Sequence, residues 1–369
     1  MLRKTIIIST ICFVCTCFTA CADLNIAEGQ RSDVNDNATK EIVDNGSVDE
    51  YEEVNINEEI DDNLFIQAEI KIPTREIGIY KTELKQFDCD IIKDILFDNP
   101  DKVVVSEDGR YISGESELYA SDGCLGYIKS SGIGYIDLLY SYAENKNELN
   151  SSELEFETIE EAMDQAEAVL SNLNMGCSHT VPQAYSLSLD ELEDLQSEIE
   201  LDDDYSGMIE AKNLVGKEFG SKSGYYYLEY TFDLEGMNIY GPGDYGNFEQ
   251  GFDDAELAQD MSITIVISEN GIEELTISGA VAPEELIEKD KIIGYEKIKE
   301  SIIDYYADEI LECECSFNCF SLMYIPIIDA DSFTSVTLTP VWKCNVVYTI
   351  EGEEYETTMY INAVNGDVL

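Results

Sequence analysis

The sequence predicts an α+β fold in which helices pack against antiparallel sheets. Apolar residues recur at helical spacing between positions 159 and 173. Two alternating apolar segments flank Asn270-Gly271, which is the strongest short-range signal for a tight hairpin. Three strand-like runs then close the chain without a helix between them: CFSLMYIPII, VTLTPVWKCNVVYTI and YETTMYINAVNGDVL. The hairpin, a helix expected in GYEKIKESIIDYYADEIL and the closing meander, in that order, are typical of an α+β body with antiparallel sheets.

The chain opens with a processing signal. Arg3 and Lys4 precede an apolar run that is too short to span a bilayer core of roughly 30 Å. The run ends in FTAC, which resembles the lipoprotein box of bacteria. That resemblance implies removal of residues 1–20 and lipidation of Cys21, so that the protein is held at the cell membrane on its extracellular face. The alternatives are a secretory signal cut after Ala20 or an uncleaved anchor helix.

An acidic segment, residues 21–62, follows the signal. It holds many Asp and Glu residues, few aromatic residues and no evident apolar periodicity. Such a composition buries too little apolar surface to offset the entropy of ordering. We therefore expect a disordered tether, and because charged linkers extend by self-repulsion, it would hold a folded body away from the membrane.

The rest of the chain is long enough for two domains, and we place a boundary near Asn150. The N-terminal α+β domain, residues 63–150, contains a helical pattern in TELKQFDCDIIKDILF. Alternating segments broken by Asp-Gly turns follow it. This pattern predicts a helix laid on an antiparallel sheet.

The C-terminal α+β domain, residues 151–369, begins with the clearest helix. Thr158 and Glu161 form a capping box before its apolar stripe, and Gly176 lies just past its end. Ser188 and Glu191 repeat the capping-box pattern ahead of a shorter helix. The remaining expected elements are a strand pair around Glu235-Gly236, the Asn270-Gly271 hairpin, a helix in GYEKIKESIIDYYADEIL and the closing strands.

The end of the chain carries a resemblance to known proteins. The segment SENGIEEL, the run LTPVW at Leu338–Trp342 and the ending INAVNGDV at Ile361–Val368 resemble uncharacterised surface lipoproteins of Gram-positive gut bacteria. They also resemble the extracytoplasmic regulators YycH and YycI and, more distantly, PepSY-type modules. The resemblance implies cystatin- or PepSY-like units in which a helix packs on a sheet, and a regulatory role. YycH and YycI are anchored by a helix rather than by lipid, and the resemblance transfers no functional residue.

Charge and composition exclude several functions. The chain carries 21 Lys and Arg residues against 78 Asp and Glu residues, a formal net charge of −57. Such a field repels nucleic acid, so we expect no nucleic-acid partner. The only histidine is His179, which rules out a two-histidine zinc site. A dyad of Cys177 and His179 would need converging side chains and an orienting third group, which near-adjacent positions seldom provide.

The cysteines offer one candidate metal site. Three leave with the signal peptide and Cys21 is lipidated, which leaves an odd number, so a complete intramolecular disulfide set is impossible. In the cluster ECECSFNCF, the thiolates of Cys313, Cys315 and Cys319 could converge on a soft metal. The spacing is not that of a zinc ribbon, and small buried strand residues are the alternative explanation.

These observations predict a lipid-anchored extracytoplasmic lipoprotein that acts as a binding or regulatory module, without catalysis and without a cofactor. Its contacts would be the membrane through Cys21 and a membrane or cell-wall protein. The alternatives are a solute-binding lipoprotein and a carboxylate-based envelope hydrolase. The strand and helix order lacks the repeated alternation of a two-lobed solute-binding protein. The many carboxylates single out no catalytic pair.

Overall fold

The computed structural model describes residues 51–202 and 223–369, apart from 241–254, 258–260, 308–309, 330–331 and 333. It also describes a few positions between 205 and 220. The predicted signal peptide, Cys21 and the tether as far as residue 50 lie outside the described residues. Residues Asp49–Leu369 form one compact unit. Nowhere in the described part of the chain is a helix both long enough and apolar enough to cross a membrane.

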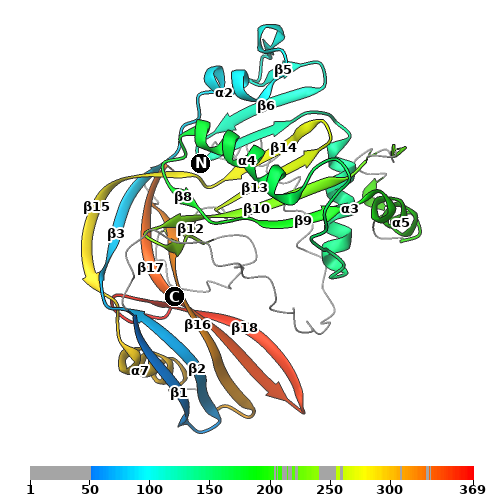
Figure 1. Cartoon of the computed structure of the whole chain (residues 1–369). Coiled ribbons are helices and arrows are strands. Elements are labelled where there is room, and N and C mark those ends of the chain that lie inside the picture. Colours follow the sequence, from blue (N-terminus) through cyan, green and yellow to red (C-terminus); the bar gives the residue numbers. More distant parts are fainter. Residues whose placement is uncertain are drawn as a thin grey trace, which may run out of the picture. The chain divides into compact units, whose positions relative to one another are not determined.

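The predicted α+β class is confirmed, because the described strands form two sheets packed by helices (Figure 1). The first sheet has eight strands in the order β1-β2-β16-β17-β3-β15, with β12 beside β16 and β18 beside β17. Its pairs are antiparallel except for the parallel pair of β2 and β16. The bounds are β1 (Tyr51–Asp61), β2 (Leu64–Pro73), β3 (Glu76–Leu84), β12 (Ala255–Leu257), β15 (Val281–Lys291), β16 (Glu314–Asp329), β17 (Ser335–Ile350) and β18 (Glu353–Asn362).

The second sheet has ten antiparallel strands in the order β11-β10-β13-β14-β7-β6-β5-β4, with β8 and β9 both beside β10. The bounds are β4 (Val104–Val105), β5 (Tyr111–Ser113), β6 (Ser116–Ser121), β7 (Cys124–Ile128), β8 (Ser178–His179), β9 (Gln183–Leu187), β10 (Tyr225–Leu234), β11 (Met237–Asn238), β13 (Ser262–Ser268) and β14 (Gly271–Ser278). The helices are α2 (Cys89–Leu96), η1 (Pro100–Lys102), α3 (Ile133–Asn145), α4 (Ile159–Leu173), α5 (Leu189–Ile199) and α7 (Tyr295–Tyr306).

Helices cover both faces of the second sheet. Alternate residues of a strand point to opposite faces, and along β10 they enter different cores. Tyr226 and Leu228 belong to the core that includes the apolar side of α4, whereas Tyr225 and Tyr227 belong to the core built with α3 and α5. Figure 1 shows α4 in front of the sheet, with α3 and α5 at its right-hand end. The first sheet carries α7 beside β1.

Both predicted capping boxes are present. Thr158 accepts from the backbone N–H of Glu161, and the Glu161 carboxylate accepts from the Thr158 N–H. The same reciprocal bonds join Ser188 and Glu191 at the start of α5. Helix α4 ends at Leu173, after which the chain enters the left-handed region.

A polar cluster ties the turn between β2 and β3 to the turn after β10. The Arg75 guanidinium donates to Glu235 Oε2 at 3.0 Å and also to the Glu235 carbonyl oxygen. Tyr80 donates to the other carboxylate oxygen. Burial acts to raise the pKa of Glu235, but the hydrogen bonds from Tyr80 and Arg75 and the Arg75 charge hold it below its usual value. The cluster therefore fastens the two sheets through an ionised carboxylate.

The end of the predicted tether is corrected by the structure. Residues Tyr51–Asp61 form β1, which pairs along its length with β2 through a turn at Asp62-Asn63. Val54, Ile56 and Ile60 pack against the main core. These apolar residues lie at even spacing among acidic ones, which is the pattern of a half-buried strand rather than of a linker.

The predicted division near Asn150 does not match the strand pairing. Strand β7, from the predicted N-terminal domain, pairs with β14 from the predicted C-terminal domain. Strand β3 likewise pairs with both β15 and β17. Residues 63–150 and 151–369 therefore contribute strands to the same two sheets, because pairing between distant strands overrides a division suggested by local patterns.

Candidate functional site

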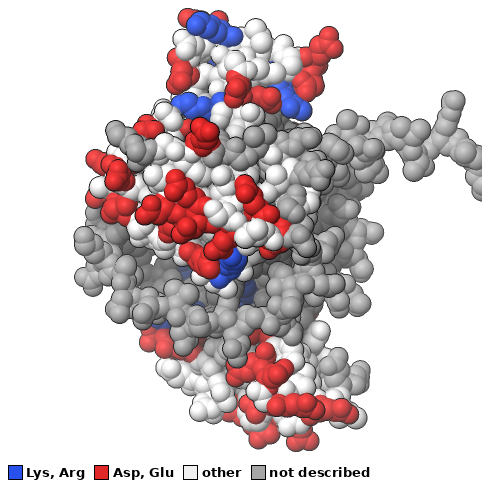
Figure 2. Space-filling view, turned by 90° about the vertical axis from the view of Figure 1, so that its right-hand side faces the viewer, with Lys and Arg blue, Asp and Glu red and all other residues white. Residues whose placement is uncertain are grey.

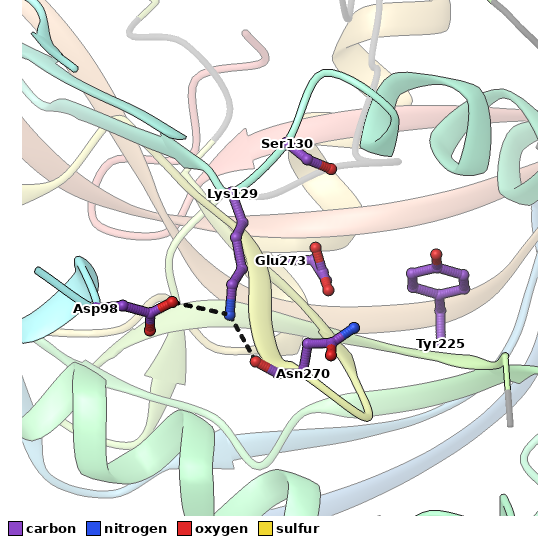
Figure 3. Close-up of a pocket in the computed structure, with 6 residues that line it drawn as sticks. All are labelled: Asp98, Lys129, Ser130, Tyr225, Asn270 and Glu273. Atoms are coloured by element: carbon purple, nitrogen blue, oxygen red, sulfur yellow. Dashed lines mark hydrogen bonds and ion pairs between the residues drawn. The ribbon is translucent and has the colours of Figure 1, made fainter. Parts of the chain in front are cut away.

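A polar pocket of about 520 Å³ lies at the end of β7, beside the β13–β14 hairpin and the start of β10. Its lining is entirely polar or aromatic: Asp98, Lys129, Ser130, Tyr225, Asn270 and Glu273 (Figure 3). The volume is within the range of small-molecule sites. The pocket opens to solvent and is the candidate functional site.

The pocket forms where the hairpin meets β7. Gly271 supplies the positive φ of +86° that the tight turn requires. Strand β7 pairs with β14 up to Ile128 opposite Glu274, and the Lys129 N–H then donates to the Glu273 carbonyl oxygen at 2.7 Å. The chain continues through Ser130 into α3. The end of β7 is thereby fixed against the hairpin.

A β-bulge directs Glu273 into this pocket. Val266 pairs with Glu274 and Ile267 pairs with Ile272, so Glu273 is an extra residue without a partner on β13. Its side chain is directed toward Ser268, whose hydroxyl donates to Glu273 Oε1 at 2.6 Å. Glu273 is 8% exposed. The bulge thus places a largely buried carboxylate in the wall of the pocket.

Lys129 provides the positive charge of the lining. Its ammonium donates to the Asn270 carbonyl oxygen at 2.6 Å and lies 3.9 Å from Asp98 Oδ2 (Figure 3). The side chain of Lys129 is 22% exposed, whereas that of Asp98 is 78% exposed. Because surface ion pairs are weak and screened by salt, Asp98 neutralises this ammonium only in part.

Two hydroxyl groups complete the lining. Burial raises the pKa of Tyr225 to about 12, and the nearby carboxylate of Glu273 acts in the same direction. The phenol therefore keeps its proton at neutral pH and can donate a hydrogen bond. Ser130 can donate or accept. The lining thus combines two carboxylates, an ammonium and neutral donors, which suits recognition of a small polar or charged molecule.

The structure does not bring the predicted thiolate ligands together. Cys315 is buried, and its thiol faces the Tyr306 hydroxyl at 3.8 Å. A bulge between Phe317 and Cys319 shifts the alternation of β16, so Cys319 is exposed. Cys313 lies just before the strand begins. Within the described residues, no group of three or more His, Cys, Asp and Glu side chains is arranged to hold a metal ion.

Cys177 and His179 also contact other groups. Burial raises the pKa of the Cys177 thiol to about 12, and this thiol lies 3.7 Å from the Val281 carbonyl oxygen. His179 Nε2 lies 3.5 Å from a Glu167 oxygen, and its ring packs edge-on against Tyr230. A thiol that holds its proton this firmly is a poor nucleophile.

None of the pocket residues was predicted as a site residue. The sequence did carry one signal, which is the consecutive pair Glu273-Glu274 in a strand of otherwise apolar character. A strand covered on both faces has no solvent side, so each of these carboxylates must occupy a buried or specialised position. The sequence does not say which elements surround them.

Fold and pocket together define an α+β protein of two largely antiparallel sheets with a solvent-open polar pocket on one of them. No protein-family model matches the sequence, and no curated protein matches it.

Solved structures do show similarity. An uncharacterized protein from Eubacterium rectale is 15% identical, with a TM-score of 0.51 over 84% of this chain and 91% of that one. This likeness concerns the fold alone. YycH from Bacillus subtilis is 10% identical, with a TM-score of 0.32 over 83% of this chain and 56% of that one. The C-terminal domain of YpeB from Bacillus megaterium is 12% identical, with a TM-score of 0.24 over 72% and 85%. Scores this low do not establish a common fold, so nothing further follows from YycH or YpeB.

Proposed function

We propose that the protein is a lipid-anchored extracytoplasmic module that binds a ligand or partner and performs no catalysis. The observation that carries this proposal is the open polar pocket between the end of β7 and the β13–β14 hairpin. Its charged groups are held by structural hydrogen bonds, Glu273 by Ser268 and Lys129 by Asn270. Groups fixed in this way form a preorganised recognition surface.

The N-terminal sequence supports the anchor. FTAC at Phe18–Cys21 has the order of a lipoprotein box, and lipidation of Cys21 would hold the protein on the extracellular face of the cell membrane. One acyl chain binds only marginally, whereas two or more give a stable anchor. The proposed partner on that face is a membrane or cell-wall protein.

The surface charge supports a partner other than nucleic acid. Figure 2 shows one face with many acidic and few basic side chains. Helix α5 and its C-cap expose five carboxylates: Asp190, Glu193, Asp194, Glu198 and Glu200. Such a surface repels anionic polymers and favours basic or neutral partners.

The test is cross-linking in intact cells followed by capture of the protein, with Cys21→Ala as the matched variant. The proposal expects one membrane or wall protein to be enriched with the native chain and lost with the variant, together with a shift of the variant from the membrane to the soluble fraction. No enriched partner in either sample, or an unchanged membrane fraction for the variant, would refute the proposal as stated.

A further inference from the structure

We propose that the pocket binds the head group of a free amino acid, with the ligand's ammonium against Glu273 and its carboxylate toward Lys129 and Ser130. This inference rests on the proposed binding function and gives its small ligand a chemical class. Two observations carry it: a largely buried carboxylate without a cationic partner, and a separate positive group on the same pocket wall.

Glu273 provides the site for the ammonium. Only 8% of the residue is exposed, and Ser268 satisfies one of its carboxylate oxygens. None of the described residues forms an ion pair with Glu273. A carboxylate withdrawn from water is costly unless it is paired, and an ammonium group supplies both the missing charge and up to three donors.

The ligand carboxylate would lie against Lys129 and Ser130. Lys129 has three donors, of which one is used by the Asn270 carbonyl oxygen, while Asp98 is mostly exposed. Ser130 lies two residues before Gly132, the N-cap of α3, and the N-terminal end of a helix favours negative charge. Lys129 and Glu273 therefore offer a zwitterion a positive and a negative group at different points of one pocket.

Neutral polar groups complete the lining beside the charged ones. The Tyr225 hydroxyl and the Asn270 side chain line the same pocket, and Figure 3 shows the phenol ring on the side of Glu273 away from Lys129. A ligand without an ammonium would leave Glu273 without a counterpart, and a ligand without a carboxylate would leave Lys129 with only the mostly exposed Asp98. The geometry thus favours a zwitterion over a simple amine or a simple carboxylate.

The experiment is equilibrium dialysis of the purified full chain against three labelled probes. L-Alanine carries both charged groups, propionate lacks the ammonium and ethylamine lacks the carboxylate. We expect measurable binding of L-alanine and binding weaker by about tenfold or more for each of the other two, because a lost hydrogen bond to a charged group has about that effect. Glu273→Gln, which keeps an acceptor for Ser268, should weaken L-alanine by about tenfold and leave propionate unchanged.

Lys129→Met should weaken L-alanine and leave ethylamine unchanged. It also serves as the second variant if Glu273→Gln unfolds, which thermal unfolding would reveal. Glu107→Gln is the matched control. The substitution removes the same charge as Glu273→Gln, but Glu107 is exposed and lies outside the pocket.

Equal binding of all three probes to the native chain, L-alanine affinity unaffected by both pocket variants, or no L-alanine binding at all would overturn the inference. Capture of the cellular partner in the cross-linking experiment tells the two proposals apart. If the native chain does not bind L-alanine but the native chain and the Glu273→Gln variant both capture the partner, the zwitterion site is wrong and the binding function stands.

Discussion

A buried pair of carboxyl groups under α3 should make the stability of the protein depend on pH. Glu274 of β14 is 4% exposed and accepts a hydrogen bond from Thr276 at 2.9 Å. Asp137 of α3, which accepts a hydrogen bond from the Tyr227 hydroxyl at 2.9 Å, lies close enough to Glu274 to lower its pKa by hydrogen bonding. Two carboxyl groups can hydrogen-bond to each other only when one of them is protonated.

Burial raises the pKa of Glu274, and this effect exceeds the opposite effect of the hydrogen bonds from Thr276 and Asp137. The folded pair therefore keeps a proton at pH values where the unfolded carboxyl, with a pKa of 4.5, has lost it. The stabilisation is complete below that unfolded value and is lost as the pH rises through the raised folded value. One extra bound proton gives a slope of about 1.4 kcal/mol per pH unit in this window.

The perturbation is Glu274→Gln. An amide can donate to Asp137 and accept from Thr276 without any titrating proton, so the contact no longer depends on pH. Between pH 4.5 and the raised folded pKa, the free energy of unfolding should fall less steeply with pH in the variant than in the native chain. The difference between the two slopes should be about 1.4 kcal/mol per pH unit. At the alkaline end the variant should be the more stable of the two. Burial also raises the pKa of Glu229. The difference between the two proteins, rather than either slope alone, reports Glu274.

The assay is urea unfolding at a series of pH values, followed by the fluorescence of Trp342, the single tryptophan and 1% exposed. Asp137→Asn should reduce the slope in the same way, and the double variant should add little, because the two groups share one proton. Glu107→Gln, an exposed carboxylate, is the control and should leave the slope unchanged. An unaltered pH slope in Glu274→Gln would refute the shared-proton account.

Other predictions concern the junction and the helix ends. A double-mutant cycle with Arg75→Met and Glu235→Gln should give a coupling free energy of about 1–3 kcal/mol. The coupling should fade on acidification, because the lowered pKa of Glu235 means that the ionised carboxylate stabilises the fold. Additive effects of the two substitutions in urea unfolding would contradict this prediction. Thr158→Ala should cost about 1 kcal/mol through loss of the N-cap, and no change in the urea midpoint would contradict this. Gly176→Ala should lower the free energy of unfolding by more than about 1 kcal/mol, because φ at this position is +87° and a Cβ would lie 3.0 Å from Ala282 Cα. A thermal midpoint equal to that of the native chain would show that alanine causes no strain there.

The sequence predicted best those features that local chemistry determines. The capping boxes at Thr158 and Ser188 satisfy donors within one helical turn, so four residues contain all the necessary information. The turn at Asn270-Gly271 is equally local, because it depends on the positive φ that glycine tolerates. These predictions are confirmed for that reason.

Two other features were predicted less well, for different reasons. The partner of β1 follows directly, but the acidic composition of β1 concealed the even spacing of Val54, Ile56 and Ile60, which pack against the core. The division at Asn150 failed because the pairing of β7 with β14 joins residues far apart in the sequence. Local patterns cannot report such distant pairing.

The pocket required both kinds of information, which explains why the sequence did not reveal it. Strict alternation would place Glu273 and Glu274 on opposite faces of β14, and only the bulge at Val266-Ile267 leaves Glu273 unpaired and directed toward Ser268. The pairing of β7 with β14 then delivers Lys129 beside it. Bulges are over-represented at sheet edges and next to functional sites, where they redirect a side chain, so this interruption of a regular hairpin supports the proposed role of Glu273.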